Sequence, residues 1–470
     1  PRSTLSSSSA ASDVYKRQDM IFYCKDSGER QETTKMLLGT QRINEAGRLE
    51  IGGCDTVDLA KRFGTPLYVV DEQCMRDACR AYRAAFERHW PKSIISFSGK
   101  AFLNMAACRI VDQEGLALDV CSGGELHTAL TANVSPARLI VHGNNKSTQE
   151  MTEALKAGCW LIVTDSLPEL ALLNDLAGQL GKRPDILVRL SPGVEVDTHT
   201  HIRLGQVDTK FGLNPDNGQG MEAVKEALAL PNLKLRGIHC HIGSQIFELR
   251  PFRETIEIMV KFLARVKAET GAQLDLLDLG GGLGSQYLSQ EAPPSVEEYA
   301  AAIADALKAS LAKYDLGEIT LLQEPGRSLT AESGTTLYTI GIIKEIPEVR
   351  TYVSVDGGLS DNPRPALYQA RYNAIVANKA SSPPAQQVTI SGKHCETDTL
   401  IEDIDLPSLA PGDILAVQST GAYNYSMASN YNRFTRPAVV LVHNGEAEVI
   451  VRRETYEDLV DKDVIPPRLK

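Results

Sequence analysis

The sequence has no pair of cysteines in the form C-x-x-C, although nine cysteines are spread along its 470 residues. Cysteines paired at that spacing are typical of zinc sites and redox motifs, and dense cysteines are typical of disulfide-linked secreted domains. Scattered thiols suit a reducing compartment instead. We therefore expect a cytoplasmic protein in which most cysteines are small packing residues.

The sequence also lacks an apolar run long enough to span a bilayer, which takes about 20 residues. It has no excess of positive charge, because 49 Lys and Arg stand against 60 Asp and Glu, which gives a formal net charge of −11. Such a balance argues against nucleic acid or an anionic membrane as the main partner. It is compatible with a local basic pocket for a small anionic ligand.

Residues 1–36 have almost no apolar periodicity and do not begin with methionine; the first methionine is Met20. The stretch PRSTLSSSSAASDVYKRQ is rich in serine and lacks the apolar core of a secretory signal. We predict a disordered or non-native leader here, with an organelle transit peptide as the less favoured alternative.

Apolar strands alternate with helix-like segments between residues 93 and 323. Eight such units predict an α/β fold, a parallel sheet closed into a (β/α)8 TIM-type barrel over residues 76–330. A doubly wound open sheet is the alternative, but its G-x-G-x-x-G fingerprint is absent. The predicted strands are Ser93–Ser98, Leu116–Cys121, Leu139–His142, Trp160–Thr164, Asp185–Leu190, Leu235–His241, Leu276–Leu279 and Ile319–Gln323.

Beyond residue 330 the alternation stops, and short β-rich runs are separated by Gly, Pro and Asp turns. This pattern predicts a C-terminal antiparallel β domain, similar to a sandwich or barrel. The run Leu67–Val70 is expected to join it, so that the domain comprises residues 37–75 and 331–470.

Polar residues and glycines follow the predicted barrel strands. The active site of a (β/α)8 barrel lies at this carboxyl end, so we expect a ligand site there. The residues concerned are Lys100, Asp119, His142, Arg189, His199, His201, Lys210, His239, His241, Ser244, Gly280, Gly281, Gly282, Glu324, Pro325, Gly326 and Arg327.

Lys100 directly follows the first barrel strand. A lysine at such a place is most often solvated, but a desolvated amine with a lowered pKa would suit imine chemistry. The segment Gly280–Gly282 can turn backbone N–H groups toward an anion, and Arg327 adds a planar cation. Although a glycine run can be a simple tight turn, the pair favours a phosphate site.

An amine and a phosphate site at one edge suggest pyridoxal 5'-phosphate, with Lys100 holding its aldehyde as a Schiff base. Glu324 is then the candidate partner of the ring nitrogen, unless it is a buried salt bridge to Arg327. His241 is suited to stack on the ring. His239 and His241 could instead form a metal pair, but no third ligand is evident and we predict no metal.

An ordered set of motifs from about Gly52 to the C-terminus resembles the alanine-racemase-like (fold type III) pyridoxal phosphate enzymes, and within them the diaminopimelate decarboxylases. The resemblance implies a barrel plus a β domain, a homodimer with active sites at the subunit interface, and decarboxylation of meso-2,6-diaminopimelate to L-lysine, the last step of lysine biosynthesis. The motifs are GTPLYVVDE, SGKAF, ALDVCSGGEL, HGNNKS, DTKFGL, HCHIGSQI, DLGGGLG, EPGRSL, DGGLSDNPRPALYQA, HCET and STGAYNYSMASNYN.

The resemblance also implies residue roles. Lys100 and Cys395 are catalytic, and Cys395 and Glu396 come from the partner subunit, where the thiol returns a proton and the carboxylate binds the distal amino group. The implied cofactor-binding residues are Lys100, Asp119, His142, His241, Ser244, Gly280, Gly281, Gly282, Glu324, Pro325, Gly326, Arg327 and Tyr423. The implied substrate-binding residues are Arg327, Arg364, Tyr368, Glu396 and Tyr423.

Two motifs depart from the family pattern. The usual C-E-[ST]-x-D has Asp398 one place early and Thr399 in the fifth place, so we expect a repacked loop or a lost Asp contact. The usual Y-A-x-K-A-N ends here on Phe102. Three alternatives stay open: a sister decarboxylase of ornithine, lysine, arginine or carboxynorspermidine, an inactive binding protein, and a metal-dependent barrel enzyme.

Overall fold

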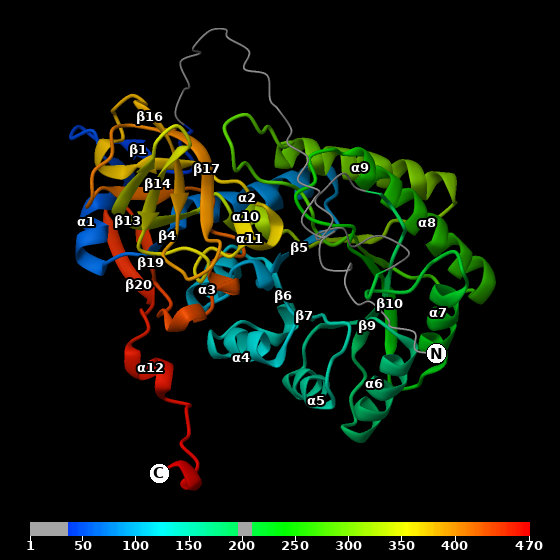
Figure 1. The fold of residues 1–470 in the computed structure, drawn as a ribbon. Helices are drawn as coiled ribbons and strands as arrows, with labels where there is room; N and C mark the ends of the chain where they lie inside the picture. The colour runs from blue at the N-terminus through cyan, green and yellow to red at the C-terminus, as the bar shows by residue number, and fades with distance from the viewer. Residues whose placement is uncertain (1–35, 196–208) are drawn as a thin grey trace, which may run out of the picture. The chain divides into compact units, whose positions relative to one another are not determined.

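Eight parallel strands close into a barrel in the order β10-β11-β12-β5-β6-β7-β8-β9 (Figure 1). This computed structural model describes residues 36–195 and 209–470. The predicted (β/α)8 barrel is confirmed, and every predicted strand end lies within one residue of the observed end. The strands are β5 (Ser93–Ser98), β6 (Ala117–Val120), β7 (Leu139–Val141), β8 (Leu161–Thr164), β9 (Asp185–Leu190), β10 (Lys234–Cys240), β11 (Leu276–Asp278) and β12 (Thr320–Gln323).

Helices surround the barrel and bury their apolar faces against it (Figure 1). In α8, for example, Ile256, Met259, Val260 and Leu263 are buried at the three- and four-residue spacing of one helix face. The helices are α2 (Glu72–His89), α3 (Met105–Gln113), α4 (Gly123–Thr131), α5 (Thr148–Ala157), α6 (Leu167–Gln179), α7 (Gln219–Ala229), α8 (Arg250–Thr270), α9 (Val296–Lys313) and α10 (Arg327–Thr330).

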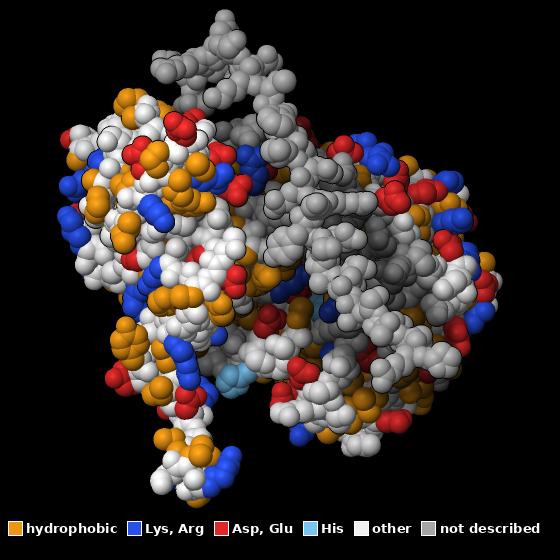
Figure 2. All heavy atoms as spheres, in the orientation of Figure 1, with side chains coloured by type: hydrophobic (Ala, Val, Ile, Leu, Met, Phe, Trp, Pro, Cys, Tyr) orange, Lys and Arg blue, Asp and Glu red, His pale blue; other side chains and the backbone are white. Residues whose placement is uncertain are grey.

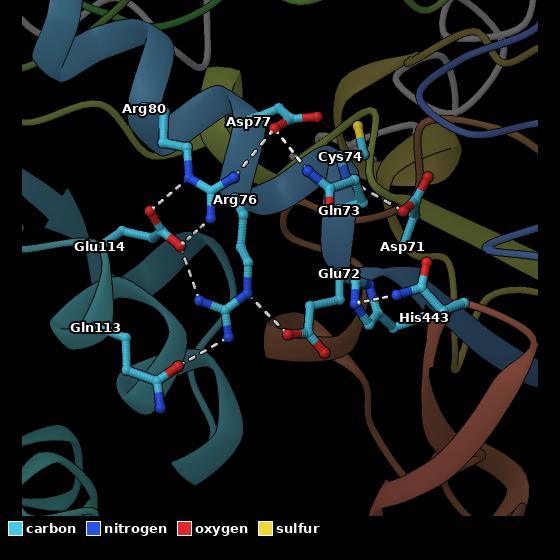
Figure 3. Close-up of polar contacts among 11 residues, drawn as sticks. Asp71, Glu72, Gln73, Cys74, Arg76, Asp77, Arg80, Gln113, Glu114 and His443 are labelled. Atoms are coloured by element: carbon cyan, nitrogen blue, oxygen red, sulfur yellow. Dashed lines mark hydrogen bonds and ion pairs between the residues drawn. The ribbon is translucent and has the colours of Figure 1, made fainter.

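Helix α2 is held to the end of α3 by a network of ion pairs (Figure 3). Arg76 and Arg80 both donate to the carboxylate of Glu114, at 2.8 and 2.9 Å, and Glu72 accepts from Arg76 at 2.7 Å. Hydrogen bonds from the two guanidinium groups lower the pKa of Glu114 below its ordinary value. The network fixes the helices on either side of β5, the strand that leads to Lys100.

A second sheet has the strand order β17-β16-β14-β13-β4-β19-β20, and β18 pairs with β13 and β15. Its pairs are mostly antiparallel, but β4–β19 and β14–β16 are parallel. Strand β4 confirms that the run after residue 66 joins the later strands. The strands are β4 (Leu67–Asp71), β13 (Gly334–Ile346), β14 (Arg350–Val355), β15 (Ala374–Val376), β16 (Gln386–Ser391), β17 (Thr399–Leu406), β18 (Ile414–Val417), β19 (Ala438–His443) and β20 (Glu446–Val451).

Short elements complete the described chain. They are β1 (Arg42–Ile43), β2 (Leu49–Ile51), β3 (Cys54–Asp55), α1 (Thr56–Phe63), α11 (Arg364–Tyr368), α12 (Tyr456–Val460), and the 3-10 turns η1 (Gly99–Ala101), η2 (Pro136–Arg138), η4 (Ala377–Lys379), η5 (Tyr425–Met427), η6 (Tyr431–Arg433) and η7 (Pro467–Leu469). Leu37–Lys470 form one unit, so the domain limits at residues 75 and 330 stay a prediction. The predicted leader, apart from Met36, and the loop histidines His199 and His201 lie outside the described residues.

The face of the molecule drawn in Figure 2 carries Lys and Arg side chains interspersed with Asp and Glu. Among the helices within residues 36–195 and 209–470, none has both the length and the apolar character that a membrane crossing requires.

Candidate active site

A cavity of about 740 Å³ lies at the carboxyl ends of the barrel strands and is also lined by residues that follow the barrel in sequence. Of the predicted site residues that the structure describes, Lys210, Gly280, Pro325, Cys395 and Glu396 are not in its lining. The predicted residues that line it are Lys100, Asp119, His142, Arg189, His239, His241, Ser244, Gly281, Gly282, Glu324, Gly326, Arg327, Arg364, Tyr368 and Tyr423.

Lys100 lies in the single turn η1, immediately after β5. The turn packs against β6, where the Gly99 N–H donates to Asp119 Oδ1 at 3.1 Å. Burial alone would lower the pKa of the Lys100 amine, but Tyr423, Asp119 and Cys121 around it raise the pKa above its ordinary value. For Lys100 as a free amine, these neighbours favour the protonated form over the lowered pKa considered from the sequence.

Glu324, just past β12, is buried and lies between two histidines. Its Oε1 is 2.7 Å from His142 Nε2, and its Oε2 is 3.3 Å from His239 Nε2. Burial would raise the pKa of Glu324, but these two imidazoles hold it well below its ordinary value. The alternative salt bridge to Arg327 is not what the structure shows, since Arg327 bonds instead to Ser244.

Two further buried carboxyl groups, those of Asp119 and Asp278, interact electrostatically with Glu324. Burial, together with Glu324, raises the pKa of Asp278 well above its ordinary value and that of Asp119 to about 7. These pKa shifts favour the ionised form of Glu324 and the protonated form of Asp278. An ionised buried carboxylate is the partner that a protonated ring nitrogen requires.

The two histidines of the H-x-H pair, His239 and His241, have different neighbours. His239 groups with His142, Asp278 and Glu324, whose ligand atoms lie within 4.8 Å of one another, whereas His241 is not in this group. The Nδ1 of His241 accepts from the Gly281 N–H at 3.2 Å. Burial and the nearby cation of Lys100 lower the pKa of His241 well below its ordinary value. His241 is therefore a neutral ring at the cavity wall.

The glycine run allows the ends of β10, β11 and β12 to approach closely. A Cβ on Gly281 would lie 2.3 Å from the carbonyl oxygen of Glu324, and one on Gly282 would lie 2.9 Å from that of Gly243. Gly280 and Gly282 have φ values of +64° and +127°, which favour glycine. The backbone of Gly281 and Gly282 consequently reaches the cavity, as a phosphate-binding loop requires.

Three buried arginines, Arg189, Arg327 and Arg364, line the same cavity. Arg327 donates to Ser244 Oγ from Nε at 3.1 Å and to Tyr287 Oη from Nη1 at 2.7 Å. Arg364 donates from Nη1 to Tyr372 Oη at 2.6 Å. Sequence reasoning missed both tyrosines. Tyr287 lies three residues after the last glycine of the DLGGGLG motif, and this position was the only available signal for it.

Cys395 and Glu396 are exposed and lie outside the cavity lining of their own chain. Their loop is organised by Asp398, which is buried and accepts from Leu359 N at 2.7 Å and from His394 N at 3.1 Å. Thr399 is already the first residue of β17. Asp398, at the fourth place of the motif, therefore supplies the carboxylate that holds this loop.

A sequence profile described as "Pyridoxal-dependent decarboxylase, pyridoxal binding domain" matches residues 73–331. The diaminopimelate decarboxylase of Bacillus subtilis (strain 168) is 47% identical over 431 residues, which cover 91% of this chain and 98% of the relative. The chain belongs to the diaminopimelate decarboxylase family. A second relative of that name, from Synechocystis sp., is 44% identical over 92% of this chain and 93% of its own length.

A solved structure of diaminopimelate decarboxylase from M. jannaschii, in complex with L-lysine, superposes on this family member with a TM-score of 0.86. The two chains are 36% identical, and the match covers 93% of this chain and all of the other. The similarity in fold therefore extends over almost the same length of the chain as the similarity in sequence.

The cavity of this decarboxylase fits pyridoxal phosphate, its cofactor. The chain provides an amine at Lys100, an ionised carboxylate at Glu324, a neutral ring at His241 and a glycine-lined backbone at Gly281. Each matches one part of the cofactor: the aldehyde, the ring nitrogen, the ring face and the phosphate.

Proposed function

We propose that this enzyme decarboxylates meso-2,6-diaminopimelate to L-lysine and CO2, the last step of lysine biosynthesis. The buried guanidinium groups of Arg327 and Arg364 lie in the wall of the cavity that contains Lys100, and this observation carries the proposal. Guanidinium groups bind carboxylates through two parallel hydrogen bonds. A substrate with a second, distal carboxylate therefore suits this cavity better than a simple basic amino acid.

The cofactor, when bound, supplies an electron-withdrawing ring that accepts the electrons released as CO2 departs. Lys100 holds it at the end of β5. The carboxylate of Glu324, itself held by His142 and His239, would bind the ring nitrogen and keep it protonated. The neutral ring of His241 would cover the cofactor ring and exclude water there.

Substrate recognition falls to residues on the other walls. Arg327, Arg364 and Tyr368 hold the distal carboxylate, and Tyr423 contacts both the phosphate and the substrate. Tyr423 is anchored close to Lys100, because its N–H donates to Ala101 O at 2.8 Å. Only one end of the substrate is then free to react, so that the distal amino acid group survives as that of L-lysine.

The proton that replaces the lost carboxylate comes, in this proposal, from Cys395 of a second subunit, and Glu396 of the same loop binds the distal amino group. Both residues are exposed and do not line the cavity of their own chain. The proposed enzyme is a cytoplasmic homodimer with shared active sites, and each chain comprises a barrel (76–330) and a β domain (37–75 and 331–470).

The test is a CO2-release panel with meso-diaminopimelate, ornithine, lysine and arginine, each with and without added pyridoxal phosphate. We expect release from meso-diaminopimelate to exceed release from the other three by at least about 100-fold in kcat/KM. A preference for ornithine, lysine or arginine would overturn the assignment in favour of a sister decarboxylase.

The variant Arg364→Ala tests the distal site directly. Loss of one charged partner of the substrate should lower kcat/KM on meso-diaminopimelate by about 10- to 100-fold. Arg250→Ala removes an exposed arginine that pairs with Glu254 on α8, and it should leave kcat/KM within twofold. Equal values for the two variants would refute the role of Arg364.

A further inference from the structure

Tyr287 is a buried tyrosine that none of the motif-based roles includes. It lies in the loop after β11 and lines the cavity. Its backbone N–H donates to Glu291 Oε2 at 2.7 Å, and its ring packs edge-on against Tyr372 with 5.4 Å between ring centroids. The backbone and the ring of Tyr287 are therefore both held within the wall of the site.

Tyr287 contacts the guanidinium groups of Arg327 and Arg364. Its hydroxyl accepts from Arg327 Nη1 at 2.7 Å, and its ring face lies 4.9 Å from Arg364 Cζ. Arg327 Cζ lies 5.8 Å from the same ring. One side chain thus receives a hydrogen bond from one cation and offers its π-face to the other.

Two buried cations near one another repel unless electron-rich groups lie between them. Tyr287 supplies such a group through both its oxygen and its ring. Burial alone would raise the pKa of its hydroxyl, but Arg327 and Arg364 hold it below the ordinary value, in accord with a strong interaction with both.

We propose that Tyr287 is a positioning and specificity residue, which sets the two guanidinium groups at the spacing that receives the distal carboxylate. The inference deepens the proposed function and rests on it for the identity of the substrate. With Phe at position 287, Arg327 loses the hydrogen bond from Nη1 and is held only by its bonds to Ser244, while Arg364 keeps its ring contact. The distal carboxylate then meets one less firmly oriented cation.

Two ligands that differ only in that carboxylate test the proposal on the holoenzyme. L-lysine, the product, retains the distal carboxylate, whereas cadaverine is the same diamine without it. We expect Tyr287→Phe to raise the calorimetric Kd of L-lysine about tenfold and to change that of cadaverine less than twofold. Tyr287→Leu, which also removes the ring, should weaken L-lysine binding further. KM for meso-diaminopimelate should rise more than kcat falls.

Tyr299→Phe is the matched control, because it removes a buried hydroxyl that donates to Gln323 Oε1 at 2.7 Å outside the cavity lining. It should leave both Kd values within twofold. An equal loss of affinity for both ligands in Tyr287→Phe, or an unchanged Kd for L-lysine, would overturn the proposal. A wild type that binds L-lysine but releases no CO2 from meso-diaminopimelate would refute the proposed function while leaving the comparison of Kd values decisive for Tyr287.

Discussion

Three acidic side chains, Asp119, Asp278 and Glu324, are buried at one end of the barrel, and their charges differ because their neighbours differ. Only Glu324 has two imidazoles as partners. Glu324 could be predicted from its place beside the phosphate motif, but the sequence could not show which of the three acids is ionised. That charge depends on side chains from β7, β10 and β11, which meet only in the closed barrel.

We expect Glu324→Gln to lower kcat by about 100-fold or more, since an amide cannot balance a protonated ring nitrogen. The cofactor should still attach to Lys100, and borohydride reduction followed by mass spectrometry measures this attachment. Glu257→Gln, which alters a carboxylate on α8 that accepts from Tyr314, is the control. A kcat within tenfold of wild type for Glu324→Gln would contradict its assignment.

Asp361 gives the protein a pH-dependent stability. It is buried, accepts from Gly358 N at 2.9 Å and bonds with the hydroxyl of Tyr338, and burial raises its pKa to about 7. The unfolded chain releases this proton near pH 4, so between pH 4 and 7 the native state binds more protons and stability falls as pH rises.

Asp361→Asn removes this titration. From pH 5 to pH 8, the wild type should therefore lose about 1–3 kcal/mol more of its free energy of unfolding than Asp361→Asn does. Urea unfolding of both proteins at the two pH values measures the shift. Parallel pH dependence of the two proteins would show that Asp361 is ionised in the native state throughout.

The barrel strands could be predicted at the scale of elements because each is a short apolar run between helix-like segments. Strand β17 could not, since its sequence TLIEDIDL contains three acids and shows no clear alternation. Its place in the sheet comes from pairing with β16, a long-range contact that no local pattern encodes. The same holds for Tyr287, whose role depends on two arginines distant in sequence.

The loop that carries Cys395 is held by the carboxylate of Asp398, at the fourth place of the motif. Because Asp398 accepts from Leu359 N and from the His394 ring, at 2.7 and 2.5 Å, we expect Asp398→Ala to lower kcat at least about tenfold by releasing the loop. Thr399→Ala should retain activity within twofold. Steady-state assays measure kcat of both variants. A larger loss of kcat in Thr399→Ala than in Asp398→Ala would show that position 399 governs the loop.

The proposed sharing of active sites between subunits can be tested on the whole molecule by complementation. Lys100→Ala and Cys395→Ala should each be nearly inactive alone. If each site takes Lys100 from one chain and Cys395 from the other, mixed dimers contain one intact site. Random reassociation should then restore about a quarter of wild-type activity.

The readout is CO2 release after the two variants are dissociated and refolded together, with each variant refolded alone as the control. Sedimentation at the assay concentration establishes whether the mixed species is a dimer. No recovery in a sample that does contain mixed dimers would place both residues in the same chain's site.

Strand β4 lies in the middle of its sheet, with β13 on one side and β19 on the other (Figure 1). The residues paired with Leu67 are Leu337 and Ala438. A ribosome therefore releases β4 early, but its second neighbour appears only when nearly the entire chain has been made. The barrel can assemble during this time, but the apolar strand β4 still has two edges whose backbone groups are unpaired. During synthesis this strand is the segment most in need of shielding from premature pairing with another nascent chain.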